Sequence, residues 1–218
     1  MAGVTLAPFT GWPPEALTWF HDLEADNSRA WFQAHRPTYD RAVRGPLESL
    51  LAEAAGEFGD GVVARPNRDT RFSADKAPYK TRCYARVPRP DGGGTYFVQV
   101  HAGGLFAGGG VYLPERARLA ALRRAIADDR TGAELEKIVA GMEAGGLALI
   151  RDGGLKTAPR GYPVDHPRIA LLRLPHLAGG TEWPPEPWLH TAEARDRIFA
   201  TWRAIGPLLG WVAAHAQA

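Results

Sequence analysis

Short glycine-rich turns separate strand-like segments in the middle of the chain, and this pattern constrains the fold more than any other feature. Strand-like composition and alternation occur at residues 62–65, 83–87, 96–101 and 105–112. Turn-forming residues fill two of the gaps, as Asp91-Gly92-Gly93-Gly94 and Gly103-Gly104. Because such short connections join neighbouring strands only in antiparallel order, we expect an antiparallel sheet.

Helical periodicity precedes and follows these strands. Helices are predicted from Pro13-Pro14, from Ser28, from Pro37 to Phe58 with a kink or restart at Pro46, over 114–127, from a capping box at Thr131–Glu134, and around Ile198, Trp202 and Ile205. Helices and strands therefore occur in separate runs, which is typical of α+β proteins. We expect a single domain, residues 1–218, in which N-terminal and C-terminal helices pack on a central antiparallel sheet.

Composition narrows the class of protein. The 218 residues are 45% hydrophobic and 23% charged, which is enough to build one sizeable core. The sequence lacks an apolar run of 18 residues and a signal-peptide pattern at its start, so we expect a soluble cytoplasmic protein with no membrane partner. A net charge of +2 is too small to indicate a dedicated nucleic-acid-binding protein.

Metal and cysteine chemistry have little support. Cys83 is the single cysteine, so an internal disulfide and a cysteine-based zinc site are excluded. Arg82 and Arg86 could lower the pKa of its thiol, but no histidine is placed to act as its base. The seven histidines show no H-x-x-x-H spacing, and His166, within Asp165-His166-Pro167, is equally well explained as part of a turn. We expect no metal ligand among these residues, and the sequence leaves the cofactor and the oligomeric state unknown.

Basic residues concentrate in one segment. Residues 65–89 hold eight Lys or Arg against Asp69 and Asp75, a local charge of +6, so the rest of the chain carries −4. Such concentration attracts an anion to one face of the protein. The chain has 22 arginines but only four lysines, at positions 76, 80, 137 and 156. Since an ammonium and a guanidinium are not equivalent at a structured site, Lys76 and Lys80 stand out.

This segment supplies the candidate site residues. Small residues and Pro78 favour a loop, where binding residues often gather. Anion-binding candidates are Arg68, Arg71, Lys76 and Lys80. Candidates for proton transfer are Asp69, Asp75 and Tyr79. We expect Lys76 and Lys80 to face a shared, partly open polar cleft with Asp69 or Asp75 within reach.

The segment R-D-x-R-F-S-x-D-K-x-P-Y-K, here Arg68 to Lys80, resembles the signature of a bacterial family catalogued as domain of unknown function 2461. Similar segments extend over roughly residues 9–205 and include Asn27–Phe32, Gly108-Gly109-Gly110, Leu122-Arg123, Leu155-Lys156 and Asp165-His166-Pro167. The resemblance implies no particular reaction. It does add Arg123 and Lys156 to the ligand-binding candidates, on the hypothesis that the family-like segments converge on one cluster.

Three functions are compatible with these features. The first is a small-molecule site for a phosphate or carboxylate, with or without catalysis. The second is a nucleic-acid binder with stacking platforms at Tyr84, Phe72 or Tyr96, which the mild net charge does not favour. The third is a structural ion-pair network in a non-enzymatic interaction protein whose partner surface lies elsewhere, such as residues 183–188.

Overall fold

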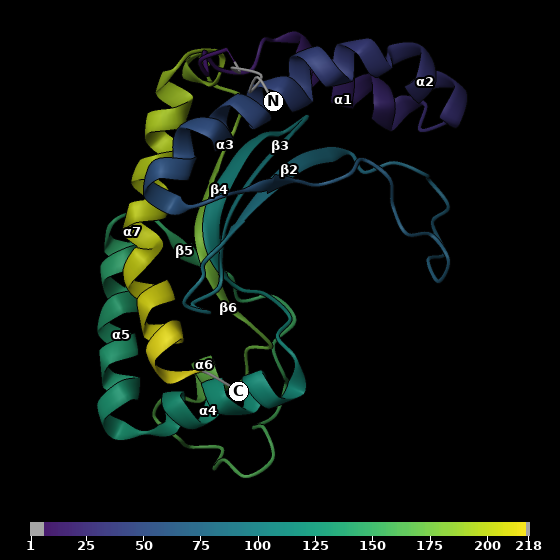
Figure 1. The fold of residues 1–218 in the computed structure, drawn as a ribbon. Coiled ribbons are helices and arrows are strands. Elements are labelled where there is room, and N and C mark those ends of the chain that lie inside the picture. Colours follow the sequence, from purple (N-terminus) through teal and green to yellow (C-terminus); the bar gives the residue numbers. More distant parts are fainter. Residues whose placement is uncertain (1–6, 217–218) are drawn as a thin grey trace. The chain divides into compact units, whose positions relative to one another are not determined.

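The strands predicted from the glycine-rich turns form one sheet. In the computed structural model, which describes residues 7–216, six strands lie in the order β1-β2-β3-β4-β6-β5 (Figure 1). Their bounds are Val62–Val63 (β1), Arg82–Pro88 (β2), Thr95–His101 (β3), Gly104–Val111 (β4), Ala148–Leu149 (β5) and Leu177–Trp183 (β6). β1 pairs antiparallel with β2, and β5 pairs antiparallel with β6. The predicted α+β fold with an antiparallel sheet is confirmed.

The chain divides into two compact units. The first unit comprises Met1–Val87, Phe97–Ala107 and Glu182–Phe199. The second unit comprises Pro88–Tyr96, Gly108–Thr181 and Ala200–Ala218. The assignment of residues 1–218 to a single domain stays a prediction. Within residues 7–216, no helix is both long and apolar enough to span a bilayer.

Helices α1, α2 and α3 open the first unit. Their bounds are Glu15–Ala25, Arg29–Thr38 and Gly45–Phe58, and a π-helical segment at Tyr39–Arg44 joins α2 to α3. Ser28 caps α2, because its hydroxyl accepts a hydrogen bond of 3.1 Å from the backbone N–H of Trp31. Pro46 lies in the first turn of α3, where its missing N–H costs nothing. The predicted restart at this proline is therefore observed.

Strand β2 has one buried and one exposed face. Cys83, Ala85 and Val87 are buried, whereas Arg82 and Arg86 are exposed and Tyr84 is half-buried between them. The reason is the two-residue period of a strand, which sends successive side chains to opposite sides of the sheet. This alternation places two arginines and a tyrosine side by side on the outer face of the first unit.

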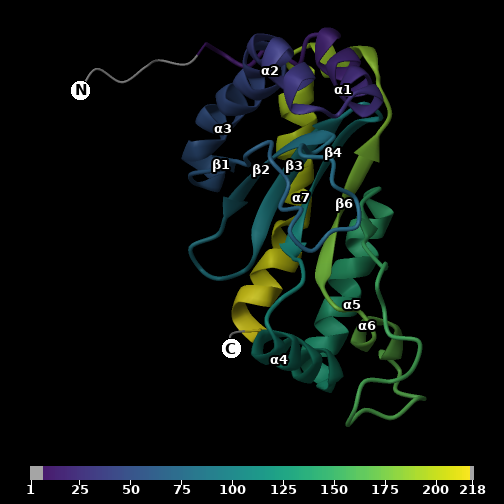
Figure 2. The same ribbon diagram turned by 90° about the vertical axis from the view of Figure 1, so that its right-hand side faces the viewer.

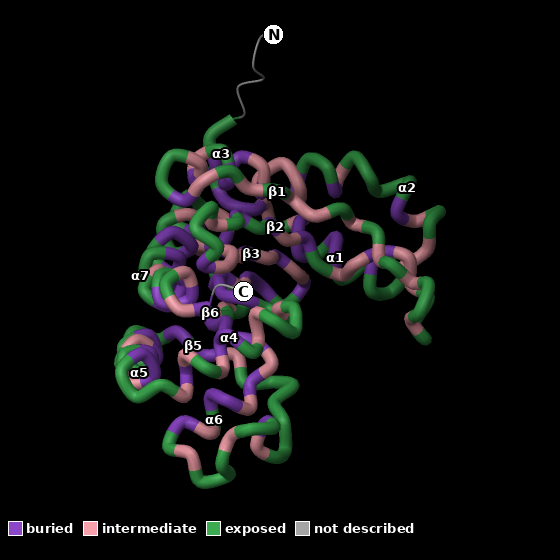
Figure 3. The backbone as a smooth tube through the Cα atoms, turned by 60° about the horizontal axis from the view of Figure 1, so that its bottom comes forward, coloured by how far each residue is buried: buried purple, intermediate pink, exposed green. Residues whose placement is uncertain are grey.

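The second unit contains α4 (Arg116–Ala127), α5 (Asp129–Ala144) and α6 (Ile169–Leu172). Buried and exposed positions alternate around α5, as expected for an amphipathic helix (Figure 3). The capping-box prediction was wrong, because α5 begins three residues earlier than the box implies. Asp128 is the N-cap, and its carboxylate accepts from the N–H groups of Arg130 and Thr131 at 3.0 and 2.9 Å. The Thr131 hydroxyl instead donates to the carbonyl of Ala125 at 2.6 Å.

The glycine run in β4 permits close backbone approach. A Cβ added at Gly108 would lie 2.2 Å from the carbonyl oxygen of Gly179, and one at Gly110 would lie 2.4 Å from the Cα of Ala178. Both partners belong to β6, a strand that the sequence analysis did not predict. Close approach of the two backbones therefore explains why glycine occupies these positions of β4.

The last elements are a 3₁₀ helix at Pro187–His190 and α7 at Glu193–His215. The 3₁₀ helix begins at the end of the segment 183–188, in which the rings of Trp183 and Trp188 meet edge to face at 5.6 Å. The C-terminal helix predicted around Ile198, Trp202 and Ile205 corresponds to α7, and all three side chains are buried.

Candidate functional site

Residues 65–81, here called the basic loop, leave β1 and return to β2. The two arms of the loop pair at its base through an antiparallel bridge between Asn67 and Tyr79. The N–H of Arg68 donates to the carbonyl of Pro78 at 2.8 Å, and the N–H of Lys80 donates to that of Pro66 at 2.9 Å. This pairing extends the line of β2 backwards and fixes the backbone that carries Lys80.

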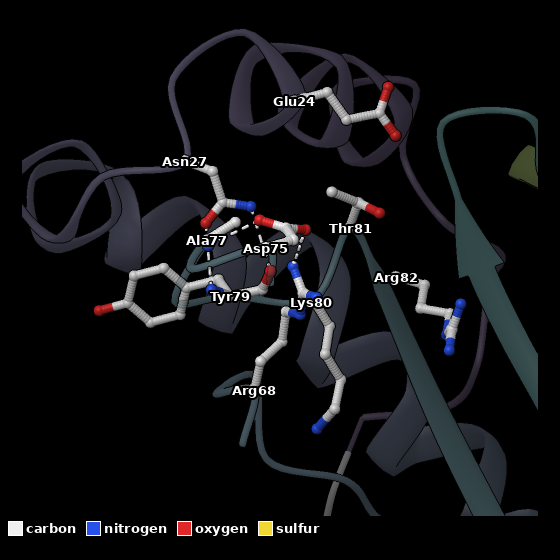
Figure 4. Close-up of a pocket in the computed structure, with 9 residues that line it drawn as sticks. All are labelled: Glu24, Asn27, Arg68, Asp75, Ala77, Tyr79, Lys80, Thr81 and Arg82. Carbon is white, nitrogen blue, oxygen red and sulfur yellow. Dashed lines mark hydrogen bonds and ion pairs between the residues drawn. The ribbon is translucent and has the colours of Figure 1, made fainter. Parts of the chain in front are cut away.

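The joint between α1 and α2 holds the same backbone from the other side. The amide nitrogen of Asn27 donates to the carbonyl of Tyr79 at 3.1 Å, and its oxygen accepts from the N–H of Tyr79 at 3.0 Å (Figure 4). The Tyr79 ring stacks on Phe32 in α2, with centroids 3.9 Å apart and planes inclined by 10°. Tyr79 is only 4% exposed, so its ring is a packing element of this joint.

A cavity of about 450 Å³ opens beside the base of the loop. Its lining consists of Glu24, Asn27, Arg68, Asp75, Ala77, Tyr79, Lys80, Thr81 and Arg82 (Figure 4). Three of these side chains are cations and two are carboxylates. The lining is therefore polar and formally carries one positive charge.

Two ion pairs engage the acidic residues of the loop. Arg68 donates to Asp75 at 2.5 Å, and the second carboxylate oxygen of Asp75 accepts from the N–H of Ala77 at 2.9 Å. Arg71 binds Asp69 through two side-chain hydrogen bonds of 2.6 and 2.9 Å. The hydrogen bonds from Arg68 and Arg71 hold the pKa values of Asp75 and Asp69 below their usual range. Both carboxylates are consequently ionised and engaged at neutral pH.

Lys80 lies in a different electrostatic environment. Its ammonium donates to the carbonyl of Arg65 at 2.5 Å and lies 5.4 Å from the centre of the Tyr84 ring. Partial burial lowers the pKa of Lys80, and the positive charges of Arg65, Arg82 and Arg86 lower it further. We call these four residues, Arg65, Lys80, Arg82 and Arg86, the cation cluster. Within residues 7–216, none of the four forms an ion pair with a carboxylate.

A family model matches nearly the whole length of the chain. The model is described as "Conserved hypothetical protein (DUF2461)" and covers residues 15–211. The chain belongs to the DUF2461 family. The resemblance drawn from the segment Arg68 to Lys80 is thereby confirmed. No curated protein and no solved structure matches the chain.

The remaining candidates drawn from DUF2461-like segments occupy other positions. Lys76 donates to the carbonyl of Thr70 at 3.0 Å and does not line the cavity, so the cleft contains Lys80 and Asp75 without Lys76 or Asp69. Arg123 belongs to the second unit, where its Nε donates to the carbonyl of Leu172 at 3.0 Å and burial lowers its pKa. Lys156 is exposed in the same unit. Convergence of Arg123 and Lys156 with the basic loop stays a prediction.

Cys83 lies on the inward face of β2. It is buried, and its sulfur lies 3.4 Å from the hydroxyl of Tyr39. Burial raises the pKa of Cys83, so the lowering that Arg82 and Arg86 could have produced is not found. The reason is the strand period, which directs Cys83 inward and both arginines outward. Within residues 7–216, no group of three or more His, Cys, Asp or Glu side chains could hold a metal ion.

Sequence reasoning missed several site residues of this DUF2461 protein. Asn27 lies 52 positions before Tyr79, and nothing in its local sequence indicates that pairing. Arg65, Arg82 and Arg86 were counted in the basic segment but not selected as ligand-binding candidates. Extending the alternation of β2 back to Lys80 would have found two of them, because residues 80, 82 and 86 share a face.

Proposed function

We propose that the protein binds a small anionic ligand, a phosphate or a carboxylate, at the cation cluster beside the cavity. The observation that supports this most strongly is the half-buried ammonium of Lys80. It lies close to three guanidinium groups and has no carboxylate partner, which is an unfavourable arrangement of like charges. A bound anion would supply the missing counter-charge, and charge-assisted hydrogen bonds would hold it.

The loop carboxylates fit a supporting role better than a catalytic one. Asp69 and Asp75 are ionised and paired with arginines, so neither is poised to donate a proton near neutral pH. Figure 4 shows the Tyr79 side chain directed away from the Lys80 ammonium. The geometry therefore supports ligand binding as the function of this site, and it offers no argument for proton transfer by these three residues.

A structural ion-pair network describes only part of the basic loop. Arg68 and Arg71 are satisfied by Asp75 and Asp69, as that alternative requires. The same account leaves the cation cluster unexplained. The proposed anion site therefore rests on Lys80 and its neighbouring arginines rather than on Arg68, Arg71 or Lys76.

Equilibrium binding measurements test the proposal. Isothermal titration calorimetry with inorganic phosphate, pyrophosphate and citrate should show saturable binding to the wild-type protein. Lys80→Met and Arg82→Gln should each weaken binding about tenfold, because a hydrogen bond to a charged group contributes about 1.5–3 kcal/mol. Lys137→Met and Arg116→Gln remove the same charges from exposed positions of α5 and α4 and should leave affinity unchanged. Absence of saturable binding by the wild-type protein, or equal losses in site and control variants, would contradict the proposal.

A further inference from the structure

We propose that the ligand of this site is a nucleoside phosphate, whose phosphate meets the cation cluster and whose base stacks on an aromatic row beside it. This inference rests on the proposed function and names the class of ligand. The aromatic row consists of Tyr84 in β2, Phe97 in β3 and Phe106 in β4. These three residues belong to the first unit and come from neighbouring strands of the sheet.

The three rings form a continuous strip across the strands. The centroids of Tyr84 and Phe97 are 5.3 Å apart, and those of Phe97 and Phe106 are 6.0 Å apart. All three side chains are half-buried, whereas the residues that flank them in their strands are mostly buried. The open face of an antiparallel sheet usually carries polar residues, so a strip of aromatic rings there indicates a surface that receives a ligand.

The strip lies on the face that carries the cations. Tyr84 is flanked at two-residue spacing by Arg82 and Arg86, so the three side chains leave β2 on the same side. The Lys80 ammonium lies 5.4 Å from the Tyr84 ring and joins the strip to the cation cluster. Figures 1 and 2 show the basic loop on the side of β2 and β3 that faces away from α3. One ligand could therefore contact both the cation cluster and the aromatic row.

A polar side chain completes the surface. Gln99 follows Phe97 by two residues on the same face of β3 and is half-buried. Its amide offers both a donor and an acceptor. Such a group beside a stacking ring is suited to the polar edge of a base, which an unsubstituted aromatic acid would lack.

Charge and size favour a single nucleotide over a long polymer. The positive charge is concentrated in residues 65–89, and the rest of the chain carries −4, so an extended polyanion would meet unfavourable surface beyond the site. The cavity of about 450 Å³, which shares Lys80 and Arg82 with the cation cluster and lies beside the aromatic row rather than under it, falls within the range of small-molecule sites. These two observations favour a mononucleotide.

The test compares ligands that share a phosphate but differ in the ring. Calorimetric titrations would use inorganic phosphate, ribose 5-phosphate, the four ribonucleoside 5′-monophosphates and a ten-nucleotide single strand. We expect at least one nucleoside monophosphate to bind at least tenfold more tightly than ribose 5-phosphate. Phe97→Leu and Tyr84→Leu should each reduce that advantage at least fivefold while leaving phosphate affinity within twofold, since stacking on an aromatic ring contributes only when a base is present.

Tyr112→Leu is the matched control, because Tyr112 is an aromatic residue of the second unit that is 57% exposed and lies outside the strip. It should not change any affinity. Equal affinities for ribose 5-phosphate and every nucleoside monophosphate would overturn this inference while leaving phosphate binding, and so the proposed function, intact. Failure to bind phosphate would instead overturn the proposed function. A single strand that binds much more tightly than any monophosphate, with a steep salt dependence, would overturn the assignment to a mononucleotide.

Discussion

Asn27 pairs with the backbone of Tyr79 through both ends of its side-chain amide, at 3.1 and 3.0 Å. The amide thereby imitates the reciprocal hydrogen bonds that one strand makes with another. The adjoining residue is Lys80, so this pairing sets the position of the ammonium on which the proposed anion site depends. A residue in the joint between α1 and α2 thus controls the geometry of a loop 52 positions later.

Asn27→Ala should detach the base of the basic loop from this joint. The substitution leaves the N–H and carbonyl of Tyr79 without their partner, at a cost of about 1–3 kcal/mol. Urea denaturation should report that loss, and hydrogen exchange should show faster exchange at the Tyr79 amide. Asn67→Ala is the matched control, because Asn67 takes part in the bridge to Tyr79 through its backbone alone. Similar stability of both variants would show that the Asn27 amide does not hold the loop.

Local patterns in the sequence predicted much of the fold. The turn at Asp91–Gly94 and the alternation in 83–87 indicated antiparallel strands, and helical periodicity marked α1 to α5. Strand β6 was missed because Ala178, Gly179 and Gly180 have low strand propensity, and these residues form a strand through their pairing with β5 and their close approach to β4. The start of α5 was misplaced because Asp128 and Thr131 are both suitable N-cap residues. In the structure the Thr131 hydroxyl donates a hydrogen bond to the carbonyl of Ala125 in α4, and Asp128 is the N-cap.

Arg168 should be a major stabilising residue of the second unit. Its buried guanidinium donates to the carbonyls of Ile126 and Ala127 at 2.7 and 3.1 Å, where α4 ends, and to Asp129 at 2.7 Å. Arg168→Met leaves those carbonyls unpaired, so we expect the free energy of unfolding to fall by about 2–3 kcal/mol. Arg160→Met, at an exposed position, should change it by less than about 0.5 kcal/mol. Equal urea midpoints for the two variants would contradict this role.

The thiol of Cys83 should make the protein less stable at alkaline pH. Its pKa is raised in the folded state from an ordinary value of 9.0, so above about pH 9 the unfolded chain has lost a proton that the folded chain keeps. The folded state binds more protons in that range, and stability must therefore fall as pH rises. Denaturation between pH 7 and 10 should show a smaller alkaline loss in Cys83→Ala than in the wild-type protein.

Thiol reactivity provides an independent check on the same residue. Ellman's reagent at pH 8 should react slowly with the native protein and rapidly after denaturation in guanidinium chloride, because Cys83 is the single cysteine and is buried. Rapid reaction of the native protein would show that the thiol is accessible and would remove the basis for the alkaline effect.

Gly110→Ala should be strongly destabilising. Gly110 has φ of +143°, and an added Cβ would lie 2.4 Å from the Cα of Ala178, so both strain and a backbone clash oppose the substitution. We expect a loss of about 1–3 kcal/mol or more in the free energy of unfolding. Gly141→Ala in α5 meets nothing within 4 Å and should stabilise by up to about 1 kcal/mol. A lower melting temperature for Gly110→Ala and a higher one for Gly141→Ala, each relative to the wild-type protein, would verify the close approach between β4 and β6.

The site was predicted less completely than the fold. Charge concentration selected the basic segment as the candidate site, but charge alone does not distinguish paired cations from unpaired ones. Arg68 and Arg71, both selected from the sequence, bind aspartates of their own loop. Lys80 is the central cation of the proposed site. The pairing of residues 66–68 with 78–80 places its side chain within the electrostatic influence of Arg82 and Arg86, and this placement depends on strand register, which the sequence does not reveal.

The most direct test of the anion site observes the lysines themselves. The chain has only four, so selective ¹³C and ¹⁵N labelling of lysine gives a simple NMR spectrum in which each signal can be assigned by Lys→Arg substitution. Before ligand is added, Lys80 should titrate below the ordinary pKa of a lysine side chain, because partial burial and the neighbouring cations lower its pKa. Phosphate should shift the Lys80 signal saturably and raise its pKa, while Lys137 stays unchanged. If all four lysines respond to phosphate weakly and in parallel, or if the pKa of Lys80 is not below the ordinary value for a lysine side chain, the cation cluster is not an anion-binding site.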